Sequence, residues 1–409
     1  MMDFFQVQSL DAVLQRRKAF QRVETQEVPL TAAVERILAQ PAVADVDLPG
    51  FARSTMDGYA VAAASTYGAS EGNPAYLQVV GRVAMGELPS QTAGPGETLG
   101  IATGGMLPPG TDSVVMVEHT EKLDDTTLEV YQSVAPGQHV VTADEDWRQG
   151  AEVLTPGRRL RPQEVGLLAA IGQDPITVYR RPRIGIISTG DEIIPVDTRP
   201  NPGQIRDVNS YTLASLIQIA GGDPKLYGIV KDRFEELRTC CSQALSACDM
   251  VLISGGSSVG QRDYTVKVLE SIDQAEILVH GVTISPGKPT ILARVAGKAI
   301  WGLPGHVTSA MVVFDALVRP FIQWIGGREN ALTQQARVKA RLSRNVASVS
   351  GRVDFVRVRL INGQEELQAE PILGKSGLLR TMVEADGIIE IDINSEGLNK
   401  NSEVIVYIL

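Results

Sequence analysis

The stretch Asp249–Glu270, DMVLISGGSSVGQRDYTVKVLE, decides the fold class of this chain. It opens with a short apolar run, MVLIS, which predicts a buried strand, and it closes with TVKVLE, which predicts a helix. Between them lies a turn that carries Gly255, Gly256, Ser257, Ser258, Gly260 and Asp263. In an open parallel sheet, ligands bind beyond the carboxyl ends of the strands. The stretch therefore predicts a ligand-binding strand–turn–helix junction.

The residue types of this turn suit a phosphate-bearing ligand. Glycines permit a sharp turn and let a ligand approach the backbone, and the amides and dipole of a helix start attract an anion. Ser257 and Ser258 add hydroxyl donors. Asp263 would repel a bare phosphate, but it fits if Mg²⁺ lies between its carboxylate and the phosphate oxygens. The alternative is a glycine-rich turn with Asp263 as a helix cap, and this stretch by itself leaves both interpretations open.

Further junctions of the same kind lie before and after this turn. They are STGDEI at 188–193, GQIRDVNS at 203–210, KDRFEE at 231–236, SPGKPT at 285–290 and GLPGHVTSAM at 302–311. Together they combine glycine turns, helix starts, Lys288 and several acids. Each acid taken singly has the alternative of a cap or a solvated charge. The set suits a phosphorylated, metal-bridged ligand.

The order of strand-like and helix-like runs predicts several domains. From residue 181 apolar strands alternate with helices, which predicts a mostly parallel sheet with helices on both faces. The expected fold class is multidomain α/β plus β, with a three-layer α/β/α domain at its centre. We expect an N-terminal or linker domain at 1–44 and 146–180, a β-rich insert domain at 45–145, the α/β domain at 181–327 and a small C-terminal β-barrel at 328–409. Helices are expected at 8–22, at 31–40 and, as one long helix, at 309–326.

Composition narrows the class of protein. The 409 residues exceed one ordinary core, and 44% hydrophobic with 21% charged residues is typical of a globular protein. A net charge of −10 argues against a nucleic-acid partner. We find no apolar run of 18 residues and no signal peptide, so we expect no membrane contact and a cytoplasmic location. Three cysteines fall in one expected helix and are interpreted as buried, inert thiols.

Several stretches in this order resemble the molybdopterin molybdenumtransferase family, MoeA and the gephyrin E domain. They are STMDGYA, ATGGMLPPG followed by VVMVE, STGDE, GQIRDVNS, SGGSSVGQRDY, PGKP, LPG-x-x-x-SA, GRVDF and GKSG. The resemblance implies an L-shaped homodimer of four-domain chains, with the site shared between subunits. It also implies that the α/β domain binds molybdopterin or adenylyl-molybdopterin. The implied activity is insertion of molybdate into molybdopterin with Mg²⁺-assisted hydrolysis of the adenylyl group, releasing AMP, and a molybdopterin adenylyltransferase is an implied partner.

The resemblance also assigns site residues. Asp57 matches the loop that reaches the partner subunit's site, Thr103 a threonine of the TG-x-x-P turn, and Asp146 the acid that ends the G-Q-x-x-R-x-x-G-x-D stretch. Glu192, Asp232 and Asp263 match acids of the pocket, with Asp263 as the metal ligand. Positions associated with the molybdate oxyanion are Lys288, Pro289, Ser309, Arg352 and Ser376. The remaining cofactor-binding residues are Gly255, Gly256, Ser257, Ser258, Gly260, Pro304 and Gly305.

Three departures from the family pattern leave alternatives open. Ser285 replaces the first lysine of K-P-G-K-P, His306 stands where L-P-G-N-P-V-S has asparagine, and the stretch Gly137–Asp146 contains no arginine. Losing two cations near an anion costs on the order of a few kcal/mol if their hydrogen bonds are charge-assisted. His306 either restores positive charge or only fills space. The chain is therefore either a divergent enzyme or a weakened paralogue that acts as a dimeric scaffold. A third reading, adenylylation of molybdopterin, is disfavoured by the two β-rich parts.

Overall fold

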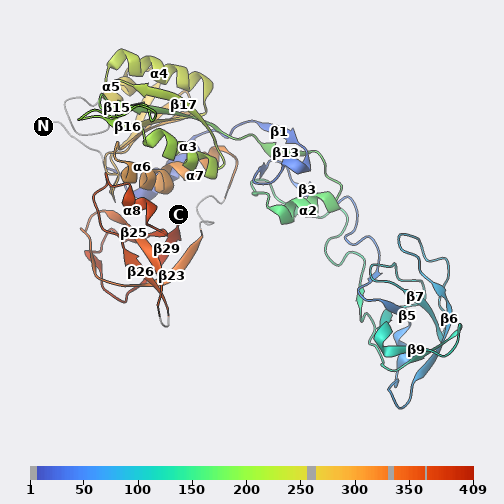
Figure 1. Ribbon diagram of the computed structural model, residues 1–409. Coiled ribbons are helices and arrows are strands. Elements are labelled where there is room, and N and C mark those ends of the chain that lie inside the picture. The colour runs from blue at the N-terminus through green and yellow to red at the C-terminus, as the bar shows by residue number, and fades with distance from the viewer. Residues whose placement is uncertain (1–6, 256–263, 330–335, 364–365) are drawn as a thin grey trace.

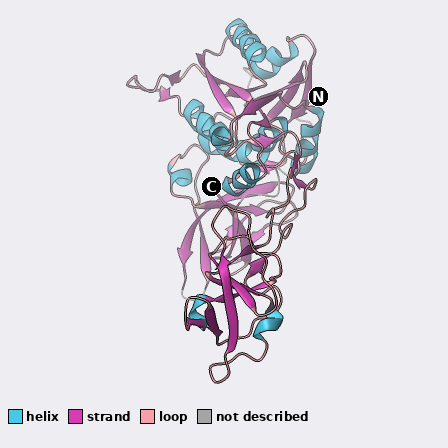
Figure 2. Ribbon diagram, turned by 90° about the vertical axis from the view of Figure 1, so that its right-hand side faces the viewer, coloured by secondary structure: helices cyan, strands magenta, loops and turns pink. Residues whose placement is uncertain are grey.

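The computed structural model describes residues 7–255, 264–329, 336–363 and 366–409. Its parts follow one another along an extended molecule (Figure 1). An α/β body lies beside a β-barrel at one end, a small three-stranded sheet with one helix follows, and a β-rich part lies at the far end. Most of the helices gather in the α/β body (Figure 2). The expected fold class, α/β plus β, is confirmed.

The central sheet has six strands in the order β17-β14-β18-β22-β21-β19. Their bounds are β14 Arg183–Thr189, β17 Asp223–Val230, β18 Met250–Ser254, β19 Ala275–His280, β21 Ile291–Val295 and β22 Lys298–Leu303. The first four strands of the sheet order are mutually parallel, and β21 and β19 are antiparallel to their neighbours. The mostly parallel sheet is therefore confirmed. The antiparallel edge arises because only Ala296 and Gly297, both at positive φ, separate β21 from β22.

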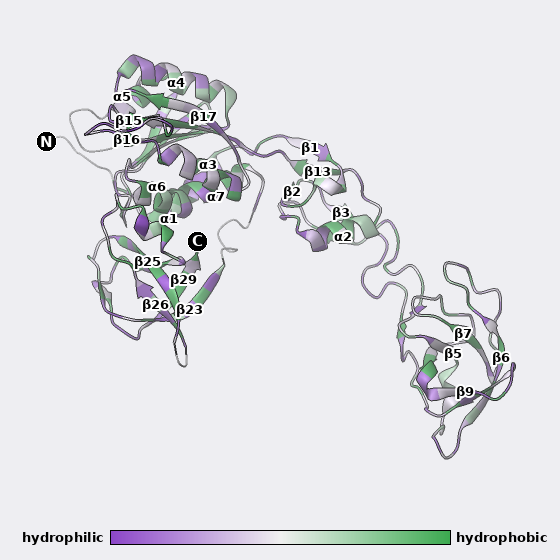
Figure 3. Cartoon of the chain, in the orientation of Figure 1, coloured by the Kyte–Doolittle hydropathy of each residue, from purple (hydrophilic) through white to green (hydrophobic). Residues whose placement is uncertain are grey.

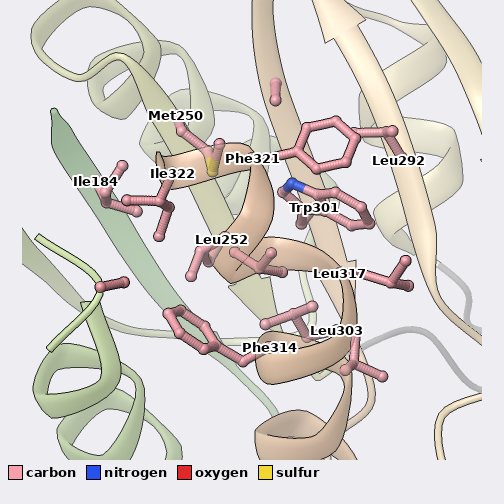
Figure 4. Packing of buried hydrophobic residues seen from close by; sticks show 14 of the residues in the cluster. Ile184, Met250, Leu252, Leu292, Trp301, Leu303, Phe314, Leu317, Phe321 and Ile322 are labelled. Carbon is pink, nitrogen blue, oxygen red and sulfur yellow. The ribbon is translucent and has the colours of Figure 1, made fainter. Parts of the chain in front are cut away.

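Helices cover both faces of this sheet. One face carries α3 (Asn209–Ile219) and the helical segment 307–325, and the other carries α4 (Phe234–Ala247) and α5 (Tyr264–Glu270). Alternate strand residues serve the two cores, so that Leu252 packs in the first and Val251 in the second. Figure 4 shows Trp301 edge-on to Phe321 in the first core, with ring centroids 4.9 Å apart. Every residue of the segment 307–313 except Met311 is buried, and Figure 3 colours much of this helix as hydrophobic.

The long helix expected at 309–326 is interrupted. It consists of α6 (Val307–Val313), a π-helical stretch Phe314–Val318 and α7 (Arg319–Ile325). Pro320 has no backbone N–H to donate to a carbonyl in the preceding turn, which explains why regular α-helical bonding does not continue there. The three cysteines are buried as expected, although Cys248 lies just after α4 rather than within it. Burial raises the pKa of Cys240, and raises that of Cys241 to about 12.

The expected helix at 31–40 is wrong. A 3-10 turn, Leu30–Ala32, is followed by Glu35 in the left-handed region at φ 65° and then by β2 (Ile37–Leu38). Strand β2 pairs with β13 (Ile176–Tyr179), so a pairing with a distant strand overrides the local helical pattern. The helix expected at 8–22 is shorter, with α1 at Leu10–Gln15 and a 3-10 turn at Arg16–Ala19.

The remaining small sheets form two separate cores. The three-stranded sheet joins β2 and β13 to β1 (Thr25–Val28), and α2 (Pro162–Ala170) packs against it. The far β-rich part has a six-stranded sheet in the order β8-β5-β7-β6-β10-β9. Its strands are β5 Gly58–Val61, β6 Ala75–Arg82, β7 Glu97–Ile101, β8 Ser113–Met116, β9 Thr120–Lys122 and β10 Thr127–Val130, with 3-10 turns at Ala63–Thr66 and Val117–His119. The two segments that connect these cores are held together by two short antiparallel pairs. These are β3 (Ala42–Val43) with β12 (Glu152–Leu154) and β4 (Arg53–Ser54) with β11 (Val140–Val141).

The C-terminal residues close into a barrel. The strands β25-β26-β23-β29-β27 form a ring because β27 also pairs with β25. Their bounds are β23 Arg337–Leu342, β25 Val353–Asn362, β26 Leu367–Pro371, β27 Gly387–Ile391 and β29 Glu403–Ile408. The rest of the elements are α8 Arg380–Val383, β15 Ile193–Ile194 with β16 Ile205–Arg206, β20 Ile284–Ser285, and β24 Val346–Ala347 with β28 Gly397–Leu398. Among the described residues, no helix is long and apolar enough to cross a membrane.

Candidate functional site

Three glycine turns meet at the carboxyl edge of the central sheet, which we call the rim. The turns follow β14, β18 and β22, and each begins or includes one of Gly190, Gly255 and Gly305. The Gly255 N–H donates to the Leu303 carbonyl at 3.2 Å. Gly255 has φ 107°, and a Cβ placed there would lie 2.2 Å from the Thr189 carbonyl oxygen. Only glycine fits this crossing of two strand ends.

Asn209, at the start of α3, forms hydrogen bonds that link the end of β18 to the turn after β22. Its side-chain amide donates to Ser254 Oγ at 2.7 Å and to the Gly305 carbonyl at 2.8 Å. Its Oδ1 is buried and has no hydrogen-bond partner among the described residues. A buried acceptor without a partner is costly, so a donor from a ligand would satisfy it. Asn209 was not singled out among the candidate site residues of the sequence. Its place within the sequence-matched GQIRDVNS stretch was the available signal.

The acids of the rim divide into structural and accessible groups. Asp207 is buried and accepts from Ser188 Oγ at 2.9 Å and from the Ser210 N–H at 3.1 Å, so it caps α3. Asp232 accepts from Thr189 Oγ1 at 2.7 Å, and the N–H of Asp232 donates to Asp191 Oδ1 at 3.3 Å. Asp191 and Glu192 are exposed. The structure therefore brings Glu192 and Asp232 to the same edge.

The barrel contributes a second wall at the start of α6. The Thr308 N–H donates to the Ser376 carbonyl at 3.2 Å, and Ser376 Oγ lies 2.9 Å from His306 Nδ1. Pro304 and Ser309 are buried beside this contact, and Gly305 is exposed. Ser376 is thus joined to the rim through the Thr308 N–H and the His306 side chain.

The Lys288 loop meets Arg352 through a short parallel pairing. In that pairing Ser285 of β20 lies opposite Asp354 of β25. Asp354 carries an ion pair with Arg352, Nε to Oδ1 at 3.0 Å, and accepts from Ser348 Oγ at 2.6 Å. Lys288 is exposed and Pro289 is half-buried.

The same loop packs on the α6 helix. Gly287 has φ 118°, and a Cβ there would lie 2.4 Å from Val313 Cγ2 at the end of α6. The Ser376 contact lies at the other end of α6, about 9 Å away along a helix of this length.

The remaining predicted residues lie elsewhere or outside the described chain. The Thr103 N–H donates to Asp57 Oδ1 at 2.8 Å, so these two residues are together in the far β-rich part. Asp146 donates its N–H to the Leu48 carbonyl at 2.9 Å, near the junction with the three-stranded sheet. Figure 1 places β5 and β7 far from the rim, so one chain does not bring these residues to it. Gly256, Ser257, Ser258, Gly260 and Asp263 lie outside the described residues.

The chain can be compared with known proteins along its whole length. Three family models match it. The model of the MoeA N-terminal region (domain I and II) matches residues 8–172, that of the "Probable molybdopterin binding domain" matches 185–324, and that of the MoeA C-terminal region (domain IV) matches 339–409. A Methanocaldococcus jannaschii molybdopterin biosynthesis protein is 37% identical over 395 residues, covering 94% of this chain and 92% of that one. A molybdopterin molybdenumtransferase of Nostoc is 33% identical, covering 94% and 88%. A solved Pyrococcus horikoshii molybdopterin biosynthesis MoeA protein is 36% identical with a TM-score of 0.79, covering 98% and 99%.

The fold and the rim define a multidomain α/β protein with a candidate ligand site where the central sheet meets a β-barrel. The chain belongs to the molybdopterin molybdenumtransferase (MoeA) family. It is accordingly a transferase of molybdenum cofactor biosynthesis, and molybdopterin is the substrate of molybdopterin molybdenumtransferases.

Proposed function

We propose that the chain inserts molybdate into adenylyl-molybdopterin and hydrolyses the adenylyl group, releasing AMP. Hydrolysis adds one water across the phosphoanhydride, and insertion joins molybdenum to the two dithiolene sulfurs while one molybdate oxygen leaves as water with their protons. The observation that supports this most is the contact of two domains at α6. The sheet supplies glycine turns for phosphate there, and the barrel loop brings Ser376 to the same helix.

The oxyanion would be held on the barrel side of the site. Lys288 and Arg352 are exposed or half-buried cations on adjoining strand ends, and Ser376 supplies a hydroxyl. A tetrahedral dianion is bound well by such a set, because charge-assisted hydrogen bonds are stronger than neutral ones. Asp354 holds the Arg352 guanidinium in place while leaving part of it exposed.

The phosphate groups would lie over the glycine turns of the rim. Gly255 lets the ends of β14 and β18 approach each other, Gly305 is exposed, and Asn209 Oδ1 offers a buried acceptor for a donor group of the ligand. Among the described residues no three acids, histidines or cysteines lie close enough to form a metal site. The fit to Mg²⁺ is through one or two carboxylates such as Asp232 and Glu192, with phosphate and water completing the shell, which is usual for this ion. Bound Mg²⁺ would withdraw charge from the diphosphate. Asp263 stays a proposed ligand.

The far β-rich part would serve the site of a second copy. Asp57 and Thr103 form one exposed pair that the fold of a single chain keeps away from the rim. In a homodimer with crossed chains, this pair would reach the partner subunit's rim. A molybdopterin adenylyltransferase would supply the adenylylated substrate.

The test is turnover of adenylyl-molybdopterin with Mg²⁺ and molybdate, measured as AMP release and as loading of molybdenum. We expect both products from the wild-type chain. Arg352→Gln should weaken molybdate binding at least tenfold, because a charge-assisted bond contributes about 1.5–3 kcal/mol. Arg359→Gln, in the strand β25 that follows Arg352, is paired with Glu384; it is the matched control and should bind normally. Dimer formation without either product would favour the scaffold function instead.

A further inference from the structure

A cavity of about 480 Å³ lies at the opposite edge of the central sheet from the rim. It is lined by Arg181 and Pro182, which precede β14, and by the end of α3 at Ile219. Strand β14 has seven residues, so the cavity and the rim are about 20 Å apart along it. The three-stranded sheet, the barrel and the chain end marked C in Figure 1 enclose the space. Its volume is in the range of small-molecule sites.

The lining of this cavity is rich in positive charge. Its arginines are Arg36, Arg159, Arg180, Arg181, Arg319 and Arg328. Its acidic side chains are Glu35, Asp315 and Glu390. Glu35 is paired with Arg159 and Asp315 with Arg319. Arg180 is paired with Asp249 and Glu24, both outside the lining. Six arginines therefore share a space with three acidic side chains, on a chain whose net charge is −10.

These arginines are held close together at an electrostatic cost. Burial lowers the pKa of Arg36, and the neighbouring Arg181 guanidinium lowers it further. Burial also lowers the pKa of Arg328, with additional repulsion from Arg159 and Arg319 that Glu35 partly offsets. Arg36 donates to the Tyr179 carbonyl at 3.0 Å, which fixes its guanidinium at the wall. Like charges gathered in a partly buried space are relieved by an anion.

Apolar side chains make up another part of the lining, which we call the apolar wall. They are Leu10, Leu14, Ile219, Val312, Phe355 and Ile388. A ligand that fills the space would therefore place an anionic group on the arginines and an uncharged body against this wall. A free inorganic anion would use only the arginine half.

We infer that this cavity is a second anion site, separate from the rim, that binds a small phosphorylated molecule with an apolar or aromatic body. The phosphoryl group would lie among Arg36, Arg181 and Arg328, where planar guanidinium groups bind it in paired hydrogen bonds. The inference does not depend on the proposed function. A rim that failed to turn over substrate would leave it unchanged.

The experiment is titration calorimetry of the full chain with AMP and with inorganic pyrophosphate. We expect the Arg36→Gln, Arg181→Gln double variant to lose at least tenfold in affinity for one class of sites, and sodium chloride to weaken the same class. Arg328→Gln, at a buried position, tests the loss of anion affinity independently of the double variant. A melting curve checks that each variant folds. Arg233→Gln, an exposed arginine paired with Glu236 on α4, is the matched control. Arg352→Gln should leave this class intact, which separates it from the rim.

Two results would overturn the inference. One is wild-type affinity in the double variant and in Arg328→Gln. The other is a change of sedimentation in these variants with no change in anion binding, because the cavity would then be a contact surface between copies. Tighter binding of AMP than of pyrophosphate would show that the apolar wall takes part, and tighter binding of pyrophosphate would confine the site to its arginine half.

Discussion

His306 Nδ1 lies 2.9 Å from Ser376 Oγ, and this contact joins the helix start of the α/β body to a loop of the barrel. The two residues are 70 positions apart in the chain. The family pattern has asparagine where this chain has His306. The geometry therefore indicates that His306 positions the Ser376 hydroxyl. A side chain that only filled space, or only supplied positive charge, would not need this contact. A hydroxyl fixed at one end loses less freedom when it binds an oxyanion.

The first prediction concerns this contact. His306→Ala should weaken molybdate binding about two- to tenfold, because a neutral hydrogen bond contributes about 0.5–1.5 kcal/mol. His306→Asn should retain most of the affinity, since an amide can also bond to the Ser376 hydroxyl. Equilibrium binding of molybdate is the measurement.

A double variant tests whether His306 acts on molybdate binding through Ser376 or independently of it. If His306 acts through Ser376, adding His306→Ala to Ser376→Ala should cost little more than Ser376→Ala alone. His119→Ala, in the far β-rich part, is the matched control. Fully additive losses would contradict the contact as the cause.

The sequence predicted the strand ends and their turns well but not the connections between domains. Strand β18 and its glycines follow from an apolar run bounded by Gly255, and its position beside β14 follows from the alternation of strand and helix. The His306–Ser376 contact could not be predicted, because it depends on how the barrel docks on the sheet. The helix expected at 31–40 was wrong for the same reason, since β2 exists only through its pairing with β13.

The second prediction concerns Gly255. Gly255→Ala would place a methyl group 2.2 Å from the Thr189 carbonyl oxygen, in a backbone region that costs about 1–3 kcal/mol for other residues. We expect a melting temperature lower by several degrees, together with loss of adenylyl-molybdopterin binding, because the ends of β14 and β18 must separate.

The matched control is Gly166→Ala in α2. A Cβ at Gly166 meets no atom within 4 Å, and alanine favours a helix, so stability should be unchanged or slightly higher. Normal ligand binding by Gly255→Ala would remove this turn from the site.

The third prediction tests the shared site. Asp57→Ala and Arg352→Gln should each be nearly inactive alone. In a 1:1 mixture of exchanging dimers, half are mixed and each mixed dimer has one site with both residues intact, so about one quarter of wild-type turnover should return. AMP release after subunit exchange measures this. Activity that stays at the level of the separate variants would mean that Asp57 does not serve the partner subunit's rim.

The last prediction concerns acid stability of the three-stranded part. Glu164 is 4% exposed and bonds to Arg161 Nη2 at 2.7 Å and Arg158 Nη2 at 2.6 Å, and it also accepts from the Arg161 N–H at the start of α2. Hydrogen bonding from Arg161 above all, with Arg158 adding to it, lowers the pKa of Glu164 to about 2. A carboxyl whose pKa is depressed on folding stabilises the protein above its unfolded pKa, and this contribution is lost as the pH falls toward the folded pKa.

Glu164→Gln should therefore lower the free energy of unfolding at pH 7 by on the order of 1–3 kcal/mol, discounted for the half-exposed arginines. The difference from wild type should shrink between about pH 4.5 and pH 2, where the wild-type carboxyl gains its proton. Urea unfolding at several pH values measures it, and Glu71→Gln, an exposed acid of the far β-rich part, is the control. A difference that stays constant down to pH 2 would show that packing, rather than the carboxylate charge, explains the loss.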